Sequence, residues 1–136
     1  MGHYPGRPFQ GTLNTSDASS GVAVPIFEIG SKTAYTLADD EFLEVHAVHL
    51  VTAAGGDSYV LIGADATLGT GETVVRGDFA QNGGIARDDI CVAGDKADTL
   101  WAVAPVGVVD VQVNGTIRKA GIGGRPSYKA AGFGQF

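Results

Sequence analysis

Hydrophobic and polar residues alternate along the middle of the chain. In the segment 42–54, Leu43 and Val45 point to one side of an extended chain, and Glu44 and His46 point to the other. This period of two residues is typical of a β-strand with one buried face. The segment therefore predicts a strand, and we expect it to lie at the centre of the domain.

The next segment, 57–64, is apolar at every position from Tyr59 to Ile62. A strand of this kind is buried on both faces, so we expect a second sheet or a neighbouring subunit to cover it. Gly55 and Gly56 separate the two segments. Because glycine adopts a positive φ at no steric cost, this pair predicts a hairpin turn between the two strands.

Shorter apolar or alternating segments, divided by turn residues, predict the other strands. Pro25 has no N–H to donate, so the segment around it belongs at a sheet edge or a bulge. The pair Asn114 and Gly115 favours a tight hairpin between the last two strands. The segments lie at 22–29, 33–37, 72–79, 90–93, 99–104, 108–114 and 116–119.

The whole pattern predicts an all-β fold without a helix. Glycine supplies 21 of the 136 residues, often in pairs between the predicted strands. About eight short strands divided by glycine turns fit an antiparallel β-sandwich of jelly-roll type. We expect one β-sandwich domain at 22–119. The flanking segments 1–21 and 120–136 are rich in glycine and have no period, which predicts extended N-terminal and C-terminal arms.

Charge is distributed unevenly along the chain. The 15 acidic residues outnumber the nine basic ones, but every charged residue after Asn114 is basic. An acidic domain is unsuited to nucleic acid, because affinity for nucleic acid comes from neutralising phosphates. We expect no nucleic-acid partner. The basic C-terminal arm is expected either to meet an acidic surface or to be a solvated, disordered tail.

Candidate chemistry is sparse. Cys91 is the only cysteine, which excludes an internal disulfide, and its apolar surroundings predict a small buried side chain. His46 and His49 are expected on opposite faces of a strand, so they would not share a metal ion. Trp101 is expected to fill the core. The sequence contains no recognised catalytic motif, so we expect no enzymatic activity, no bound cofactor and no bound metal.

No segment approaches the ~18 apolar residues that a membrane span needs. The first residues, MGHYPGRPF, contain no apolar stretch of the kind found in a signal peptide. We therefore expect no membrane partner and synthesis in a cytoplasm.

The segments GVAVPIFEIGS at 21–31 and TLWAVAPVGVVDVQVNG at 99–115 resemble capsid decoration proteins, also called cementing or head-stabilising proteins, of tailed bacteriophages. Arms with spaced aromatic residues add to the resemblance. It implies a protein on the capsid surface of a virion, made in the host cytoplasm. Such a protein binds the major capsid protein and neighbouring copies of itself, often as a homotrimer.

The resemblance also indicates which residues would contact the capsid. The aromatic anchors of the arms would be Tyr4, Phe9, Tyr128, Phe133 and Phe136. The charged contacts would be Arg118, Lys119, Arg125 and Lys129.

Three other functions remain open. The chain could be another virion component, such as a head fibre, tail or minor capsid protein. It could be a ligand-binding or carbohydrate-binding β-sandwich module, for which Tyr35, Tyr59 and Trp101 are the candidate aromatic contacts. It could also be an enzyme whose site is assembled from distant residues.

Overall fold

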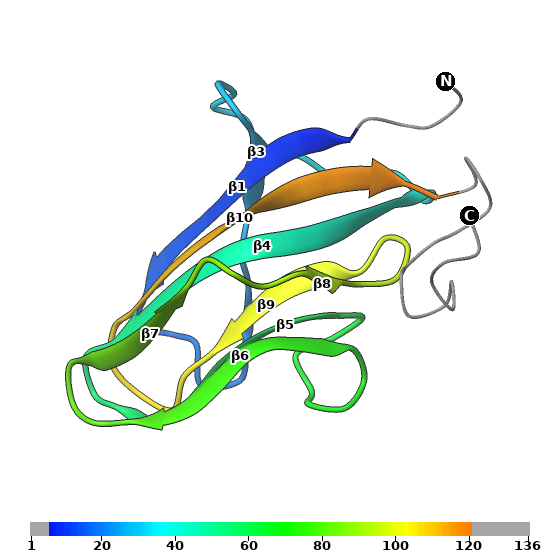
Figure 1. The fold of residues 1–136 in the computed structure, drawn as a ribbon. Helices are drawn as coiled ribbons and strands as arrows, with labels where there is room; N and C mark the ends of the chain where they lie inside the picture. The colour runs from blue at the N-terminus through cyan, green and yellow to red at the C-terminus, as the bar shows by residue number, and fades with distance from the viewer. Residues whose placement is uncertain (1–5, 121–136) are drawn as a thin grey trace.

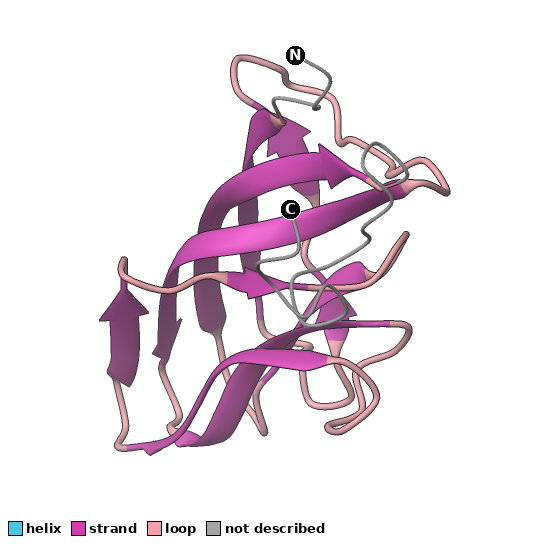
Figure 2. Ribbon diagram, turned by 45° about the vertical axis from the view of Figure 1, so that its right-hand side comes forward, coloured by secondary structure: helices cyan, strands magenta, loops and turns pink. Residues whose placement is uncertain are grey.

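Two antiparallel sheets face each other in the computed structural model, which describes residues 6–120 (Figures 1 and 2). This part of the chain contains ten strands and no helix. The strands are β1 (Arg7–Thr15), β2 (Val22–Ala23), β3 (Ile26–Glu28), β4 (Glu41–Thr52), β5 (Gly56–Gly63), β6 (Glu72–Phe79), β7 (Gly83–Arg87), β8 (Val92–Ala93), β9 (Thr99–Val103) and β10 (Val109–Lys119). The described residues contain no helix that could cross a membrane.

The strand order is that of a jelly roll. The larger sheet runs β3-β1-β10-β4-β7, with β8 also paired to β4, and the smaller sheet runs β2-β9-β5-β6. Strands consecutive in the chain therefore occupy matching places in the two sheets: β1 with β2, β10 with β9, β4 with β5, and β7 with β6. This arrangement of eight strands, supplemented by the short β3 and β8, confirms the predicted antiparallel sandwich.

The core lies between the two sheets. Val109, Val111 and Val113 on β10 are fully buried, as their alternation with polar residues predicts. Leu50 on β4 and Val60 on β5 are likewise fully buried and belong to the same apolar cluster. Burial of each such side chain stabilises the fold by about 1.5–3 kcal/mol before the entropic cost of ordering it.

The segment 1–21 is not the irregular arm that its composition predicts. Residues 7–15 form β1, which pairs with both β3 and β10 inside the larger sheet. Phe9 is only 1% exposed and belongs to the core, and Ala18 is also buried. The segment alternates between buried and exposed residues, with Phe9 facing the core, but Pro8 and Gly11 make its sequence resemble a loop. The absence of a side chain is used at Gly11, where an added Cβ would lie 3.2 Å from a methyl of Val24.

The turn at Gly55 and Gly56 connects the two sheets instead of closing a hairpin. Both glycines adopt the positive φ expected of them, +79° and +92°. However, β4 belongs to the larger sheet and β5 to the smaller one, so the two strands do not pair. Leu61 on β5 is 1% exposed within the single chain, so a neighbouring subunit is not required to cover it.

Pro25 marks another crossing between the sheets. It separates β2, an edge strand of the smaller sheet, from β3, an edge strand of the larger sheet. The predicted edge position is therefore confirmed, although the predicted continuous strand at 22–29 is divided in two. The predicted strand at 33–37 is wrong, because these residues form a loop.

Asn114 and Gly115 lie inside β10 and do not form the predicted hairpin. The register between β10 and β4 shifts at this point: Asn114 pairs with Ala47 and Gly115 pairs with Val45. His46 is thus an extra residue on β4, which is the arrangement of a β-bulge. A Cβ on Gly115 would lie 2.1 Å from the carbonyl oxygen of Glu44, so the bulge requires glycine here.

Candidate functional site

The start of β1 and the end of β10 lie side by side at one end of the larger sheet (Figure 1). Arg7 pairs with Ile117 in the register of these two antiparallel strands. The segments 1–5 and 121–136 are therefore both joined to this end. We call it the terminal end, defined by Arg7, Glu41, Arg118 and Lys119.

A charged network holds the terminal end together. Arg7 donates hydrogen bonds to Glu28, to Glu41 and to the hydroxyl of Tyr35. The Tyr35 hydroxyl donates to Glu41 Oε1 at 2.6 Å, and the Ala38 N–H donates to the same oxygen at 2.9 Å. Glu41 is 5% exposed, so this buried carboxylate depends on these partners.

The network shifts the ionisation of its members. Burial alone would raise the pKa of Glu41, but the hydrogen bonds from Ala38 and Tyr35 and the charge of Arg7 outweigh it. The pKa of Glu41 consequently lies below its ordinary value. Burial, and then the hydrogen bond to Glu41, raise the pKa of Tyr35. Glu41 is therefore a structural carboxylate, ionised and fully paired.

Two of the predicted charged contacts belong to the terminal end. Arg118 Nε donates to Glu44 Oε1 at 3.0 Å, and Lys119 Nζ lies 3.7 Å from Asp40 Oδ2. Their side chains remain 32% and 44% exposed, so a partner could still reach them.

Of the five predicted aromatic anchors, only Phe9 lies in the described part of the chain. Phe9 is a core residue and cannot serve as an arm anchor in this fold. The remaining predicted partner contacts lie outside the described residues. They are Tyr4, Arg125, Tyr128, Lys129, Phe133 and Phe136.

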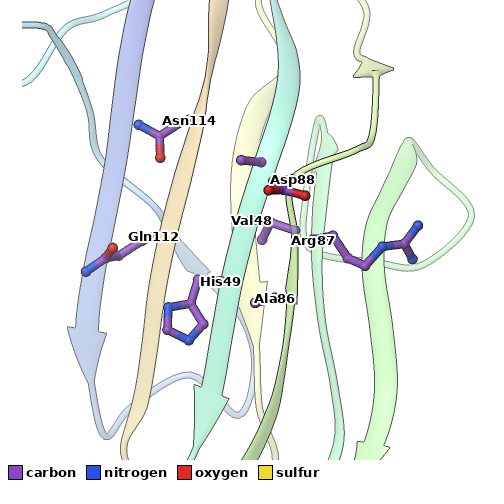
Figure 3. A pocket seen from close by; sticks show the side chains of 8 residues that line it. Val48, His49, Ala86, Arg87, Asp88, Gln112 and Asn114 are labelled. Atoms are coloured by element: carbon purple, nitrogen blue, oxygen red, sulfur yellow. The ribbon is translucent and has the colours of Figure 1, made fainter.

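A polar hollow of about 320 Å³ lies on the outer face of the larger sheet (Figure 3). His49 on β4 pairs in register with Gln112 on β10, and Asn114 lies farther along β10. Arg87 and Asp88 lie on the β7 side of the hollow. The hollow offers amide and imidazole groups that exchange hydrogen bonds with a partner or with water, but its lining contains no paired carboxylates and no nucleophile.

A second, larger hollow of about 650 Å³ is associated with the smaller sheet. Its lining includes two half-buried aromatic residues, Tyr59 and Trp101, together with Asp65 and Thr67. The indole of Trp101 donates to the carbonyl of Gly63 at 3.0 Å, which orients the ring. The prediction that Trp101 fills the core is wrong. Side chains alternate along β9, and its neighbours Leu100 and Ala102 are the ones that belong to the core, whereas Trp101 is half-buried.

Two other sequence predictions are wrong, and the β-bulge explains the first of them. On β4, the extra residue brings His46 and His49 to the same outer face: His46 lies beside Thr116, and His49 pairs with Gln112, both outward on β10. Cys91 is exposed, although its apolar neighbours predict burial. Partial desolvation of the thiol, and then the charge of Glu44, raise the pKa of Cys91.

Sequence reasoning therefore missed a group formed by Glu44, His46 and Cys91. One signal was available, since Glu44 and His46 are two residues apart and share a face of β4. The approach of Cys91, which is 45 residues further along the chain from His46, depends on the fold and has no local signal.

Comparison with known proteins gave no match to a protein-family model, a curated protein or a solved structure.

Proposed function

We propose that this protein is a structural, non-enzymatic component of a bacteriophage virion that binds the outer surface of the capsid. It would stabilise the shell through contacts of its terminal segments with the major capsid protein and with neighbouring copies. The observation that carries the proposal is the common origin of both terminal segments at the terminal end, given by the pairing of Arg7 with Ile117.

This origin suits attachment to a surface. Two segments joined at the same end of a sandwich can contact one partner together, and the first contact raises the effective concentration of the second. The C-terminal segment supplies the basic residues Arg125 and Lys129, and the exposed parts of Arg118 and Lys119 lie where it begins. These charges favour an acidic groove on the capsid.

The surface of the described residues suits a protein that assembles on a shell. Its exposed large apolar residues are Ile29, Val106 and Val108, in loops after β3 and before β10. Obligate oligomers bury larger apolar surfaces than such scattered residues provide. The homotrimer would accordingly form on the capsid, where neighbouring copies are held close together.

Co-sedimentation with capsids tests the proposal. The capsids are assembled from the major capsid protein encoded in the same genome and are prepared without this protein. We expect the full chain to sediment with them, and the double variant Arg125→Gln/Lys129→Gln to bind at least about tenfold more weakly, because it loses two attractive charges. The control Arg76→Gln/Arg87→Gln removes the same charge from β6 and β7 and should bind like the full chain.

Each outcome separates the possibilities. Equal binding by the two double variants would exclude attachment through the basic segment. Recovery of the protein with tails or fibres and not with capsids would favour another virion component.

A carbohydrate-binding module is the second candidate, favoured because Tyr59, Trp101 and Asp65 line the same hollow. Aromatic faces pack against the apolar faces of sugar rings, and carboxylates accept hydrogen bonds from sugar hydroxyls. If the protein does not sediment with capsids, the fluorescence of Trp101, the only tryptophan, can report sugar binding directly.

A further inference from the structure

Three potential metal ligands meet on the outer face of the larger sheet. Glu44, His46 and Cys91 each contribute one ligand atom, and these three atoms all lie within 4.8 Å of one another. Glu44 is buried, His46 is half-buried and Cys91 is exposed, so the group extends from the sheet surface to solvent.

The fold produces this meeting at an interruption in the sheet. The pairing of β7 with β4 ends at Val48, and the pairing of β8 with β4 includes Val45. Between these positions β4 carries the bulge at His46, and the chain returns to β4 through Cys91, the residue before β8. The bulge and the strand break thus coincide, which brings the thiol and the imidazole together.

The buried carboxylate of Glu44 is incompletely satisfied. Its Oε1 accepts a hydrogen bond from Arg118 and lies 3.1 Å from His46 Nε2. Its Oε2 is buried and has no hydrogen-bond partner, although the side chain is only 1% exposed. An unpaired buried carboxylate oxygen is unfavourable, and a cation bound to it would remove that cost.

We propose that Glu44, His46 and Cys91 form a binding site for Zn²⁺. A thiolate, an imidazole and a carboxylate are the three ligand types that zinc takes in proteins, and three protein ligands leave a fourth position open to water. The thiolate and imidazole disfavour Ca²⁺ and Mg²⁺, which prefer sites made of oxygen atoms.

Arg118 determines how the carboxylate would be shared. Its guanidinium occupies Oε1 and leaves Oε2 for the metal. Coordination of Cys91 requires the thiolate, so the thiol proton passes to solvent when the ion binds. Arg118 then lies beside the metal-bound carboxylate and orients it, which is the usual task of a hydrogen bond to a ligand.

Cobalt absorption of the purified, reduced full chain tests the site. Co²⁺ replaces Zn²⁺ in sites of this kind and gives a thiolate-to-cobalt charge-transfer band and visible ligand-field bands. We expect one Co²⁺ per chain, with both signals, and displacement of the cobalt by Zn²⁺. Cys91→Ser should lose the charge-transfer band, and His46→Ala should bind at least about tenfold more weakly.

His49→Ala is the matched control, because His49 lies on the same face of β4 but outside the group. It should bind cobalt like the unmodified chain. Cys91 and His46 are both accessible to solvent, and circular dichroism checks that the variants remain folded. The absence of a charge-transfer band, its retention in Cys91→Ser, or equal weakening in His49→Ala and His46→Ala would overturn the proposal.

Discussion

Both carboxylate oxygens of Glu41 are occupied at the point where β4 begins. Oε1 accepts from the Tyr35 hydroxyl and the Ala38 N–H, and Oε2 accepts from Arg7. Arg7 also lies over the Tyr35 ring, with its guanidinium carbon 4.9 Å from the ring centre. One buried side chain therefore joins the start of β1, the loop after β3 and the start of β4.

Replacing Glu41 with Gln should destabilise the fold by about 1–3 kcal/mol near neutral pH, because a neutral amide leaves buried partners of the carboxylate unmatched. The pKa of Glu41 is lowered by folding, so its ionised form stabilises the folded state. This contribution is complete above the ordinary pKa of a glutamate, and it is lost as the pH falls through that value towards the lower pKa of Glu41 in the folded state.

Urea unfolding of the unmodified chain and of Glu41→Gln, at neutral and at acidic pH, measures this effect. The difference between their free energies of unfolding should shrink in acid. Asp57→Asn, which removes an exposed partner of Arg76, should show little change at neutral pH. A Glu41→Gln deficit that is independent of pH would contradict the role assigned to the ionised carboxylate.

At the scale of strands, the bulge in β4 depends on Gly115 of the neighbouring strand. A side chain at this position would enter the space of the Glu44 carbonyl. The same bulge turns His46 and His49 to one face, so it determines what the outer face of the larger sheet presents.

Substitution of Gly115 with Ala should destabilise the protein by about 1–3 kcal/mol through overpacking against β4. Asn114→Ala should be nearly neutral, because Asn114 is exposed within a continuous strand. Thermal unfolding distinguishes the two variants. If Asn114→Ala proved as harmful as Gly115→Ala, the pair would instead be acting as a turn.

Local patterns predicted the parts of this fold that depend on neighbouring residues. The valines of β10 alternate with polar residues, and Pro25 interrupts strand pairing because its ring nitrogen has no hydrogen to donate. The partner of each strand is a tertiary property, so Gly55 and Gly56 predicted a turn correctly but its pairing wrongly. Phe9 was assigned to an arm and not to the core, because Pro8 and Gly11 resemble loop residues.

The candidate sites were less predictable for the same reason. The basic residues at 118 and 119 are visible in the sequence, but their partners Asp40 and Glu44 lie on or beside β4 and are known only from the fold. The zinc ligands need a bulge and a strand break at the same level of the sheet. Neither feature has a local signal that sets its position.

On the scale of the whole molecule, the jelly roll separates its two ends. The segments 1–5 and 121–136 are joined to the terminal end. The turn that contains Val106 precedes β10 and lies at the opposite end. Attachment through the terminal segments requires the first end to face the capsid and the second to face away.

Site-specific photocrosslinking measures this orientation most directly. A photoreactive residue is placed at Lys119, which is partly exposed at the terminal end, or at Val106, which is 64% exposed at the other end. After incubation with capsids, we expect crosslinks to the major capsid protein from position 119 and none from position 106. Crosslinks from position 106 alone, or from neither position on capsids that retain the protein, would contradict attachment through the terminal end.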